Sequence, residues 1–166
     1  MKTYKISLYN HFKVLSTLIF TSIIIIMVIV FLILTQGYSD GIPIIFGNGY
    51  LILSIPTLFL HLEYYFINKK DRVTINYNLS QIIINNNLYL FEEIDSIILV
   101  MPPVWHRKES IRFLPFEEYN FAKIIFKNKD EFIFTNLLEY KIENIFSKIP
   151  DINIERKSML ISTTLW

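Results

Sequence analysis

Val14 to Leu34 reads VLSTLIFTSIIIIMVIVFLIL, and this stretch decides how the rest of the chain is organised. No charged side chain occurs between Val14 and Ser39. As a helix the stretch would be about 31 Å long, at about 1.5 Å per residue, which matches the hydrocarbon core of a bilayer. Sixteen of its residues are Leu, Ile, Val or Phe, and their transfer into lipid outweighs the cost of the Ser and Thr side chains. The stretch predicts a transmembrane helix.

A secretory signal peptide is the alternative interpretation of an apolar stretch in this position. Such a peptide has an apolar core of about 7 to 15 residues, followed by a cleavage site of small residues. The apolar run is longer here, and Thr35 to Tyr38 does not form such a site. We therefore expect this helix to be retained.

A second apolar stretch runs from Ile42 to Leu62 and is also about 31 Å long if helical. The connection from Gln36 to Gly41 contains no Lys or Arg, whereas basic residues precede the first stretch (Lys2, Lys5, Lys13) and follow the second (Lys69, Lys70, Arg72). By the positive-inside rule, both termini are cytoplasmic and the protein is a multi-pass integral protein of the inner (plasma) membrane. The sequence predicts a cytoplasmic lead over 1–13 and a helical hairpin over 14–66, with spans at about 14–35 and 42–62.

The composition of the chain excludes several classes of partner and of chemistry. The chain has 166 residues, 52% of them apolar, with a mean hydropathy of +0.39. Beyond residue 66 there are 13 basic and 13 acidic residues, and this neutral balance argues against a nucleic-acid partner. The chain has no cysteine, which excludes disulfides, a thiol nucleophile and a Cys-type zinc site.

Residues 67–166 predict a domain of strands with one late helix. Apolar residues alternate over Val73–Tyr77 and continue over 81–84, 88–91, 96–101, 121–126 and 131–135, with a hairpin around 127–130. An apolar stripe at helical spacing then predicts a helix that ends before Pro150; it consists of Leu138, Ile142, Ile145, Phe146 and Ile149. The helix would cover an open face or edge of the sheet. Residues beyond Pro150 would add a strand or dock on the hairpin.

Four phrases then carry a family resemblance: LFEEIDSI at 90–97, PFEEYNFAKII at 115–125, FTNLL at 134–138 and IERK at 154–157. Together with the two spans, they resemble the bacterial membrane proteins that have a PH-like domain, over about residues 12 to 160. The resemblance implies a membrane-anchored α+β protein, with a bent antiparallel sheet, nearly a barrel, capped by the late helix. The family has no catalytic motif to transfer. Eukaryotic PH domains hold inositol phosphates in a basic pocket near their first hairpin, but the turn at Asn78–Ser80 has no Lys or Arg, so phosphoinositide binding is not expected.

Catalytic and metal-binding patterns are weak. No Gly-rich phosphate loop, HExxH or GxSxG motif occurs. His61 and Glu63 are too few for a metal site and suit the membrane interface, and the side chains of Glu117 and Glu118 diverge. His11 has no evident partner. We expect no catalytic residues, no metal and no cofactor.

The long segment from Met101 to Asn120 contains the main candidate contact residues. Long loops are commonly functional or disordered, and this one mixes aromatic and basic side chains that suit a protein contact or a lipid interface. The alternative, which we favour for the aromatics, is that Ile111–Leu114 forms a strand and the aromatics fill the core. The candidate partner or membrane contacts are Lys69, Lys70, Arg72, Trp105, Arg107, Lys108 and Arg112.

These patterns predict a non-enzymatic, membrane-anchored PH-like interaction or scaffold module at the cytoplasmic face. Its partners would be the lipid bilayer and a protein, either another protein or a second copy. The alternative function is lipid or small-ligand sensing, with the hairpin transmitting the state of the domain. A pocket between the late helix and the sheet, or between the sheet and the membrane, would favour sensing.

Overall fold

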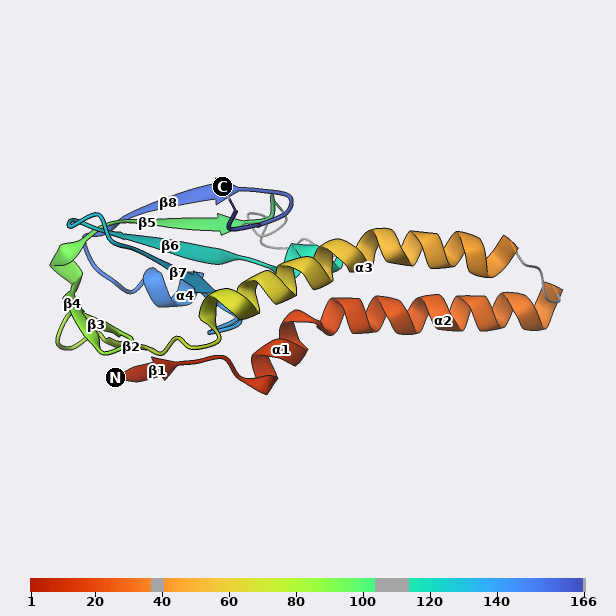
Figure 1. Ribbon diagram of the computed structural model, residues 1–166, viewed down its shortest axis with the longest axis horizontal. Helices are drawn as coiled ribbons and strands as arrows, with labels where there is room; N and C mark the ends of the chain where they lie inside the picture. Colours follow the sequence, from red (N-terminus) through yellow and green to blue (C-terminus); the bar gives the residue numbers. More distant parts are fainter. Residues whose placement is uncertain (37–40, 104–113, 166) are drawn as a thin grey trace.

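Two long helices extend from a β-rich domain in the computed structural model, which describes residues 1–36, 41–103 and 114–165 (Figure 1). Helix α2 (Ser16–Gln36) and helix α3 (Gly41–Asn68) lie side by side, and Ser22 and Tyr50 share a hydroxyl–hydroxyl hydrogen bond of 2.9 Å between them. The buried hydroxyl residues Ser54 and Thr57 each donate to a carbonyl four residues earlier in α3, which allows close helix packing in an apolar medium.

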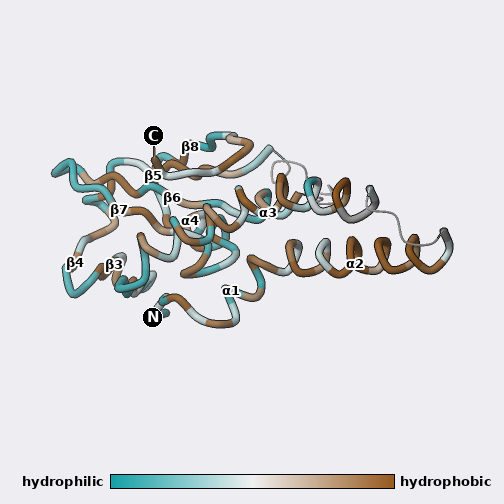
Figure 2. Tube along the Cα trace, turned by 45° about the vertical axis from the view of Figure 1, so that its right-hand side comes forward, coloured by the Kyte–Doolittle hydropathy of each residue, from teal (hydrophilic) through white to brown (hydrophobic). Residues whose placement is uncertain are grey.

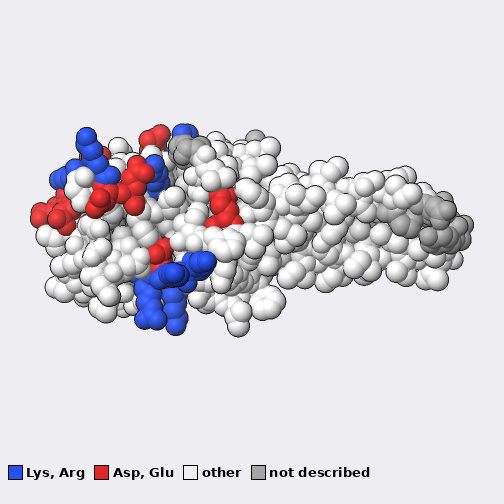
Figure 3. Space-filling view, viewed as in Figure 1, with Lys and Arg blue, Asp and Glu red and all other residues white. Residues whose placement is uncertain are grey.

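The surfaces of both helices are apolar and exposed. Only 6% of the most apolar window of Ser16–Thr35 and 17% of that of Ile44–Asn68 is buried in the protein, and both helices are long and apolar enough to cross a membrane. Figure 2 shows α2 as almost continuously hydrophobic, and in Figure 3 the charged side chains gather over the β-rich domain rather than over the outer parts of the helices. The first helix begins at Ser16, two residues later than expected, because Val14 ends a separate short helix, α1 (Leu8–Val14).

The helices are inserted between the first two strands of the domain. Strand β1 (Lys2–Tyr4) pairs antiparallel with β2 (Val73–Asn76), with Tyr4 opposite Val73. Residues 1–13, predicted as a cytoplasmic lead, therefore contain a strand of the sheet. The first pair of neighbouring strands in the domain is therefore β1 and β2, which are connected through the two helices. The turn at 78–80 connects the next pair, β2 and β3.

The first sheet has the order β1-β2-β3-β4, with β3 (Gln81–Ile84) and β4 (Asn87–Leu90) completing it. Because side chains alternate between the two faces of a strand, Val73, Ile75 and Ile82 lie on the same face of this sheet, where they are buried. Asn85 and Asn86 form the two-residue turn between β3 and β4, both with positive φ (50° and 75°), as a type I′ turn requires and as Asn tolerates.

The second sheet has the order β7-β6-β5-β8. Its strands are β5 (Ile94–Met101), β6 (Phe121–Phe126), β7 (Glu131–Thr135) and β8 (Asn153–Ser158), and the short 3₁₀ helices η1 (Phe91–Glu93) and η3 (Pro115–Glu118) precede β5 and β6. β8 pairs parallel with β5, with Ile97 opposite Ile154. The expectation of a purely antiparallel sheet is therefore wrong for this strand, because the residues after Pro150 return along the free edge of β5.

The late helix is shorter than the predicted one. Helix α4 covers only Glu143–Phe146, although the whole predicted stripe from Leu138 to Ile149 is buried. The side-chain amide of Asn10 donates to the carbonyls of Leu137 and Leu138 at 3.0 and 2.9 Å. Because these carbonyls bond to another element, the chain around residue 138 does not need a helix to pair them. The stripe covers the main core between the sheets, which includes Ile97, Ile124 and Phe134.

Candidate functional site

The helices meet the domain at a second core, here called the junction. It is formed by α1, the first turns of α2, the last turns of α3, η3 and the segments after η3 and β7. Its buried apolar side chains come from these elements other than α2, and from β5 and β6: Val14, Leu60, Tyr64, Val100, Phe116, Tyr119, Phe121 and Leu137. The junction makes the inner ends of the helices part of the domain.

Two buried asparagines connect the helices to the domain backbone. Asn10 of α1 donates to the carbonyls of Leu137 and Leu138, as described above. Asn68, the last residue of α3, donates to the carbonyl of Ile133 at 2.8 Å and accepts from the amide of Thr135 at 3.0 Å. Asn68 thus completes hydrogen bonds of β7, and an apolar side chain there would leave buried backbone groups unpaired.

A chain of three hydrogen-bonded rings crosses the junction. Nδ1 of His11 in α1 lies 2.8 Å from Nε2 of His61 in α3, and Nδ1 of His61 lies 2.9 Å from the hydroxyl of Tyr119, just after η3. Burial lowers the pKa of His11 below its usual value of 6.5. If both imidazoles were charged, two N–H groups would face each other across 2.8 Å. The chain of rings therefore requires at least one neutral imidazole.

Glu118 bonds to both sides of the junction. Its carboxylate is buried and accepts hydrogen bonds from the hydroxyls of Thr17 in α2 at 2.7 Å and Tyr140 at 2.6 Å. Burial, and then the nearby charge of Glu118, raise the pKa of Tyr119 well above its usual value near 10. Tyr119 is therefore a neutral hydroxyl at neutral pH, able to take part in the hydrogen bond with His61.

The C-terminal segment docks on the inner end of α3. The buried hydroxyl of Tyr64 donates to the carbonyl of Ser162 at 2.5 Å. The carboxylate of Glu63 accepts from the hydroxyls of Thr163 and Thr164, and from the amide of Thr164 at 2.6 Å. The residues after Pro150 thus form a strand, β8, and then a docked segment, which were the two alternatives left open by the sequence.

Three of the candidate contact residues lie at the connection from α3 to β2. Lys69, Lys70 and Arg72 are exposed, with the ammonium of Lys69 4.6 Å from the centre of the Phe66 ring. Trp105, Arg107, Lys108 and Arg112 lie outside the described residues, and so does the strand considered at Ile111–Leu114, apart from Leu114 itself. The aromatic residues Phe116 and Tyr119 of the same segment are buried, as the core interpretation expects.

Sequence reasoning missed the partners of the histidines. His11 and His61 are 50 positions apart, and only their shared place at the inner ends of the two apolar stretches indicated proximity. Glu63 and the Thr163–Thr164 pair are likewise brought together only by the fold. The predicted helical hairpin could have indicated these contacts, because it brings the residues before the first helix close to the residues near the end of the second helix.

The chemistry of the junction is that of a connector. In the part of the chain that the structure describes, no group of three or more His, Asp or Glu side chains is arranged to hold a metal ion. Glu117 and Glu118 accept from different donors, the amide of Leu114 and the hydroxyls named above. The hydrogen bonds described above attach the inner ends of the helices to the domain.

One comparison with known proteins gives a match. A family profile described as a PH domain matches residues 3–143. The matched range begins in β1, contains the whole helical insertion and ends at the start of α4. No curated protein and no solved structure matches the chain.

Proposed function

This chain belongs to the PH-domain family, and from that premise we propose that it is a non-enzymatic interaction or scaffold module anchored in a membrane. The helices α2 and α3 cross the bilayer as a hairpin, and the PH-like domain is held at the cytoplasmic face of the inner membrane. Its role there is to bring a protein partner to the membrane. The domains are a lead over 1–13, the hairpin over 14–66 and the PH-like domain over 67–166, with β1 of the lead completing the domain.

The exposed apolar surface of the helices carries this proposal. Side chains such as Ile26, Phe31 and Ile52 lie on the surface although the domain has a complete core of its own. In water this surface would be far larger than the apolar patches that monomeric proteins expose. In a bilayer it faces hydrocarbon, and the backbone of each helix is already paired internally.

The distribution of basic residues supports the orientation. Lys69, Lys70 and Arg72 are exposed between α3 and β2. Lys2 and Lys5 are exposed in β1 and just after it, and β1 pairs with β2. The connection 36–41 at the other end of the hairpin has no Lys or Arg. This asymmetry supports a cytoplasmic domain with both termini on the same side.

The protein-binding role rests on the edge strands that the described residues form. Strand β8 is an edge of the second sheet and its side chains are mostly exposed. An exposed edge can accept an added strand from a partner. Trp105, Arg107, Lys108 and Arg112 remain proposed contacts, as do Lys69, Lys70 and Arg72 at the connection from α3 to β2.

The test is a set of topology reporters in a bacterial host. A cytoplasm-active and a periplasm-active reporter are fused, in separate strains, after Trp166 and into the connection at Asp40–Gly41. We expect a cytoplasmic signal at Trp166 and a periplasmic signal at the connection. A soluble fusion, or the reverse pattern, would contradict the proposal. In-cell cross-linking from β8 tests the partner, and failure to recover a reproducible protein would contradict the scaffold role.

A cavity at the far end of the domain favours a second candidate function, the sensing of a small ligand. The cavity has a volume of about 690 Å³, within the range typical of ligand sites. It lies between the β2–β3 turn, η1, the start of β5 and the segment after α4, and its lining includes Leu79, Phe91, Ile152, the acidic residues Glu92, Asp95 and Asp151, and the basic residue Lys127. The acidic residues outnumber the single lysine, and this balance suits a cationic ligand. A thermal shift with cationic metabolites that is lost in Asp95→Asn would support sensing.

A further inference from the structure

Two short apolar surfaces flank the helices where they leave the domain. The first lies on α1, where Leu8, Tyr9 and Phe12 are 77%, 68% and 65% exposed. Leu8 and Phe12 are four residues apart and Tyr9 and Phe12 three, so the three side chains share one face of the helix. The other face is fixed to the domain through Asn10 and Val14, which are buried.

The second apolar surface lies on the C-terminal segment. Leu160 and Leu165 are 58% and 76% exposed, and Ile161 between them is also exposed. The hydrogen bonds from Tyr64 to Ser162 and from Thr163 and Thr164 to Glu63 hold this segment against α3. Its apolar side chains are therefore presented by a docked segment.

Both surfaces lie at the same level along α3. The α1 surface is connected to α3 through His61, and the C-terminal segment through Glu63 and Tyr64. These positions are within about 4.5 Å of each other along the helix axis at about 1.5 Å per residue. His61 and Glu63 are two residues apart, about 200° around the helix, so the contacts made by these two residues are on opposite sides of α3, and Tyr64 lies between them around the helix. In Figure 1, α1 and the segment after β8 lie on opposite sides of α3, at the end of the domain from which the helices extend.

The surface on α1 continues directly into the apolar helix α2. Only Leu15 separates α1 from α2, and the exposed apolar side chains of α2 begin at Ile19 and Phe20. The ammonium of Lys13 lies 5.2 Å from the centre of the Tyr9 ring and donates to its hydroxyl at 3.2 Å. Aromatic residues with neighbouring lysines are typical of the boundary between hydrocarbon and headgroups.

We propose that these two surfaces form an interfacial collar, defined as Leu8, Tyr9 and Phe12 on one side and Leu160, Ile161 and Leu165 on the other, and that its partner is the headgroup region of the phospholipid leaflet. The collar deepens the proposed membrane anchoring and rests on it. Its two sides enter the leaflet around the hairpin and set the height and tilt of the domain. The end of the domain with the 127–130 turn then points away from the membrane.

The absence of cysteine from the chain allows a direct test. Single cysteines are introduced in the full chain as Phe12→Cys, Leu160→Cys, Ile26→Cys and Asn128→Cys. Each is labelled with an environment-sensitive dye in nanodiscs of phosphatidylcholine and phosphatidylglycerol. Emission is compared with discs that contain lipids spin-labelled either near the headgroup or deep in the acyl chain. Ile26, in the middle of α2, reports on the anchoring, and Asn128, in an exposed turn of the domain, reports on water.

We expect the dyes at positions 12 and 160 to lose most of their emission with the shallow spin label and little with the deep one. The dye at position 26 should respond to the deep label, and the dye at 128 to neither. If position 26 is quenched but 12 or 160 behaves like 128, the collar is wrong and the anchoring stands. If position 26 is not quenched, the anchoring itself fails and the collar with it. A dye at 12 or 160 that is shielded from water but unquenched would indicate a covering protein, such as a second copy, and would also overturn the collar.

Discussion

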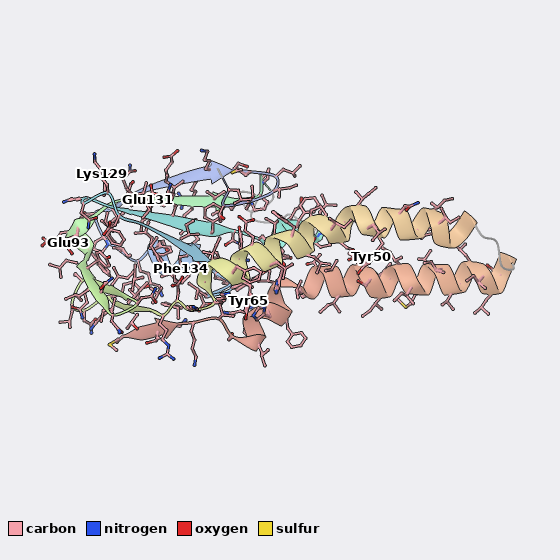
Figure 4. The ribbon with its side chains drawn as sticks, viewed as in Figure 1. Tyr50, Tyr65, Glu93, Lys129, Glu131 and Phe134 are labelled. Atoms are coloured by element: carbon pink, nitrogen blue, oxygen red, sulfur yellow. The ribbon has the colours of Figure 1, made fainter. Side chains whose placement is uncertain are left out.

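Ile26 in α2 and Ile97 in β5 carry the same side chain in the two regions of the molecule, but Ile26 is 60% exposed and Ile97 is 0% exposed. The β-rich domain packs its apolar residues against one another and against the α4 segment. The helical hairpin leaves most of its apolar residues on the surface. Phe134, inside the domain, and Tyr50, between the helices, are marked in Figure 4.

The difference shows that apolar residues in the two regions need different surroundings. Burial against protein stabilises the domain at about 25 cal/mol for each Å² removed from water. The exposed side chains of the hairpin make no such contribution until another apolar medium covers them. The junction lies between the two regions, and there the helices are attached through hydrogen bonds as well as apolar contacts. Substitutions in the domain, the hairpin and the junction should therefore produce different effects.

The largest effect on folding is expected for Phe134→Ala. Phe134 is fully buried and makes edge-to-face contacts with Tyr4 and Phe146, at ring-centre distances of 5.6 and 5.5 Å. Its loss should lower the free energy of unfolding by about 3 to 5 kcal/mol, measured by denaturant titration of the full chain in detergent micelles. Ile26→Ala is the matched control, and an equal loss there would remove the contrast between the regions.

The largest effect on membrane insertion is expected for Ile26→Lys. A lysine at the centre of a span makes insertion less favourable by about 3 kcal/mol relative to an apolar residue. The fraction of protein that resists alkaline extraction from membranes should fall, while the domain remains folded. Asn128→Lys adds the same charge on the exposed turn of the domain and should leave that fraction unchanged. Equal loss in both variants would count against the hairpin as the anchor.

A smaller effect is expected at the junction for Asn68→Ala. This change removes the donor to Ile133 and the acceptor for the amide of Thr135. Leaving these buried groups unpaired should lower the free energy of unfolding by about 2 kcal/mol. Asn78→Ala, at an exposed turn, is the matched control and should have little effect. If both variants unfold alike, the attachment of α3 to β7 contributes little.

The smallest effect is the pH dependence of the junction. Burial lowers the pKa of His11 in the folded protein, so below its unfolded value of 6.5 the unfolded chain binds more protons. Stability should therefore fall as the pH decreases through that value. Unfolding midpoints over a pH range of about 5 to 8 should show a smaller decrease in His11→Gln than in the unmodified chain. The opposite slope would show that the histidine pair is stabilised by charge.

Much of the fold follows from periodicity in the sequence. The alternation at Val73 and Ile75 predicted β2, and the strands at 81–84, 121–126 and 131–135 lie where they were expected. The buried stripe from Leu138 to Ile149 was also recognised, although only four of its residues are in the helix α4. Local patterns suffice for these elements because each pattern extends over several consecutive turns or pleats.

Strand β1 and the histidine pair could not be recognised in the same way. Lys2–Tyr4 has only three residues, and its partner begins at Val73. His11 and His61 form a pair only because the fold brings α1 against the inner part of α3. The junction was therefore absent from the sequence prediction, whereas Lys69, Lys70 and Arg72 were proposed as contact residues from charge alone.

The sequence by itself determined the two apolar helices, the neutral β-rich domain after them and the absence of cysteine chemistry. These features depend on composition and on periods of two or 3.6 residues, which are local properties of a chain. Only the tertiary structure decided that the helices are inserted between β1 and β2, that β8 runs parallel to β5 and that Glu63 holds the C-terminal segment. Each of these contacts joins residues more than 50 positions apart. Such pairings depend on the packing of the whole chain, and no local pattern specifies them.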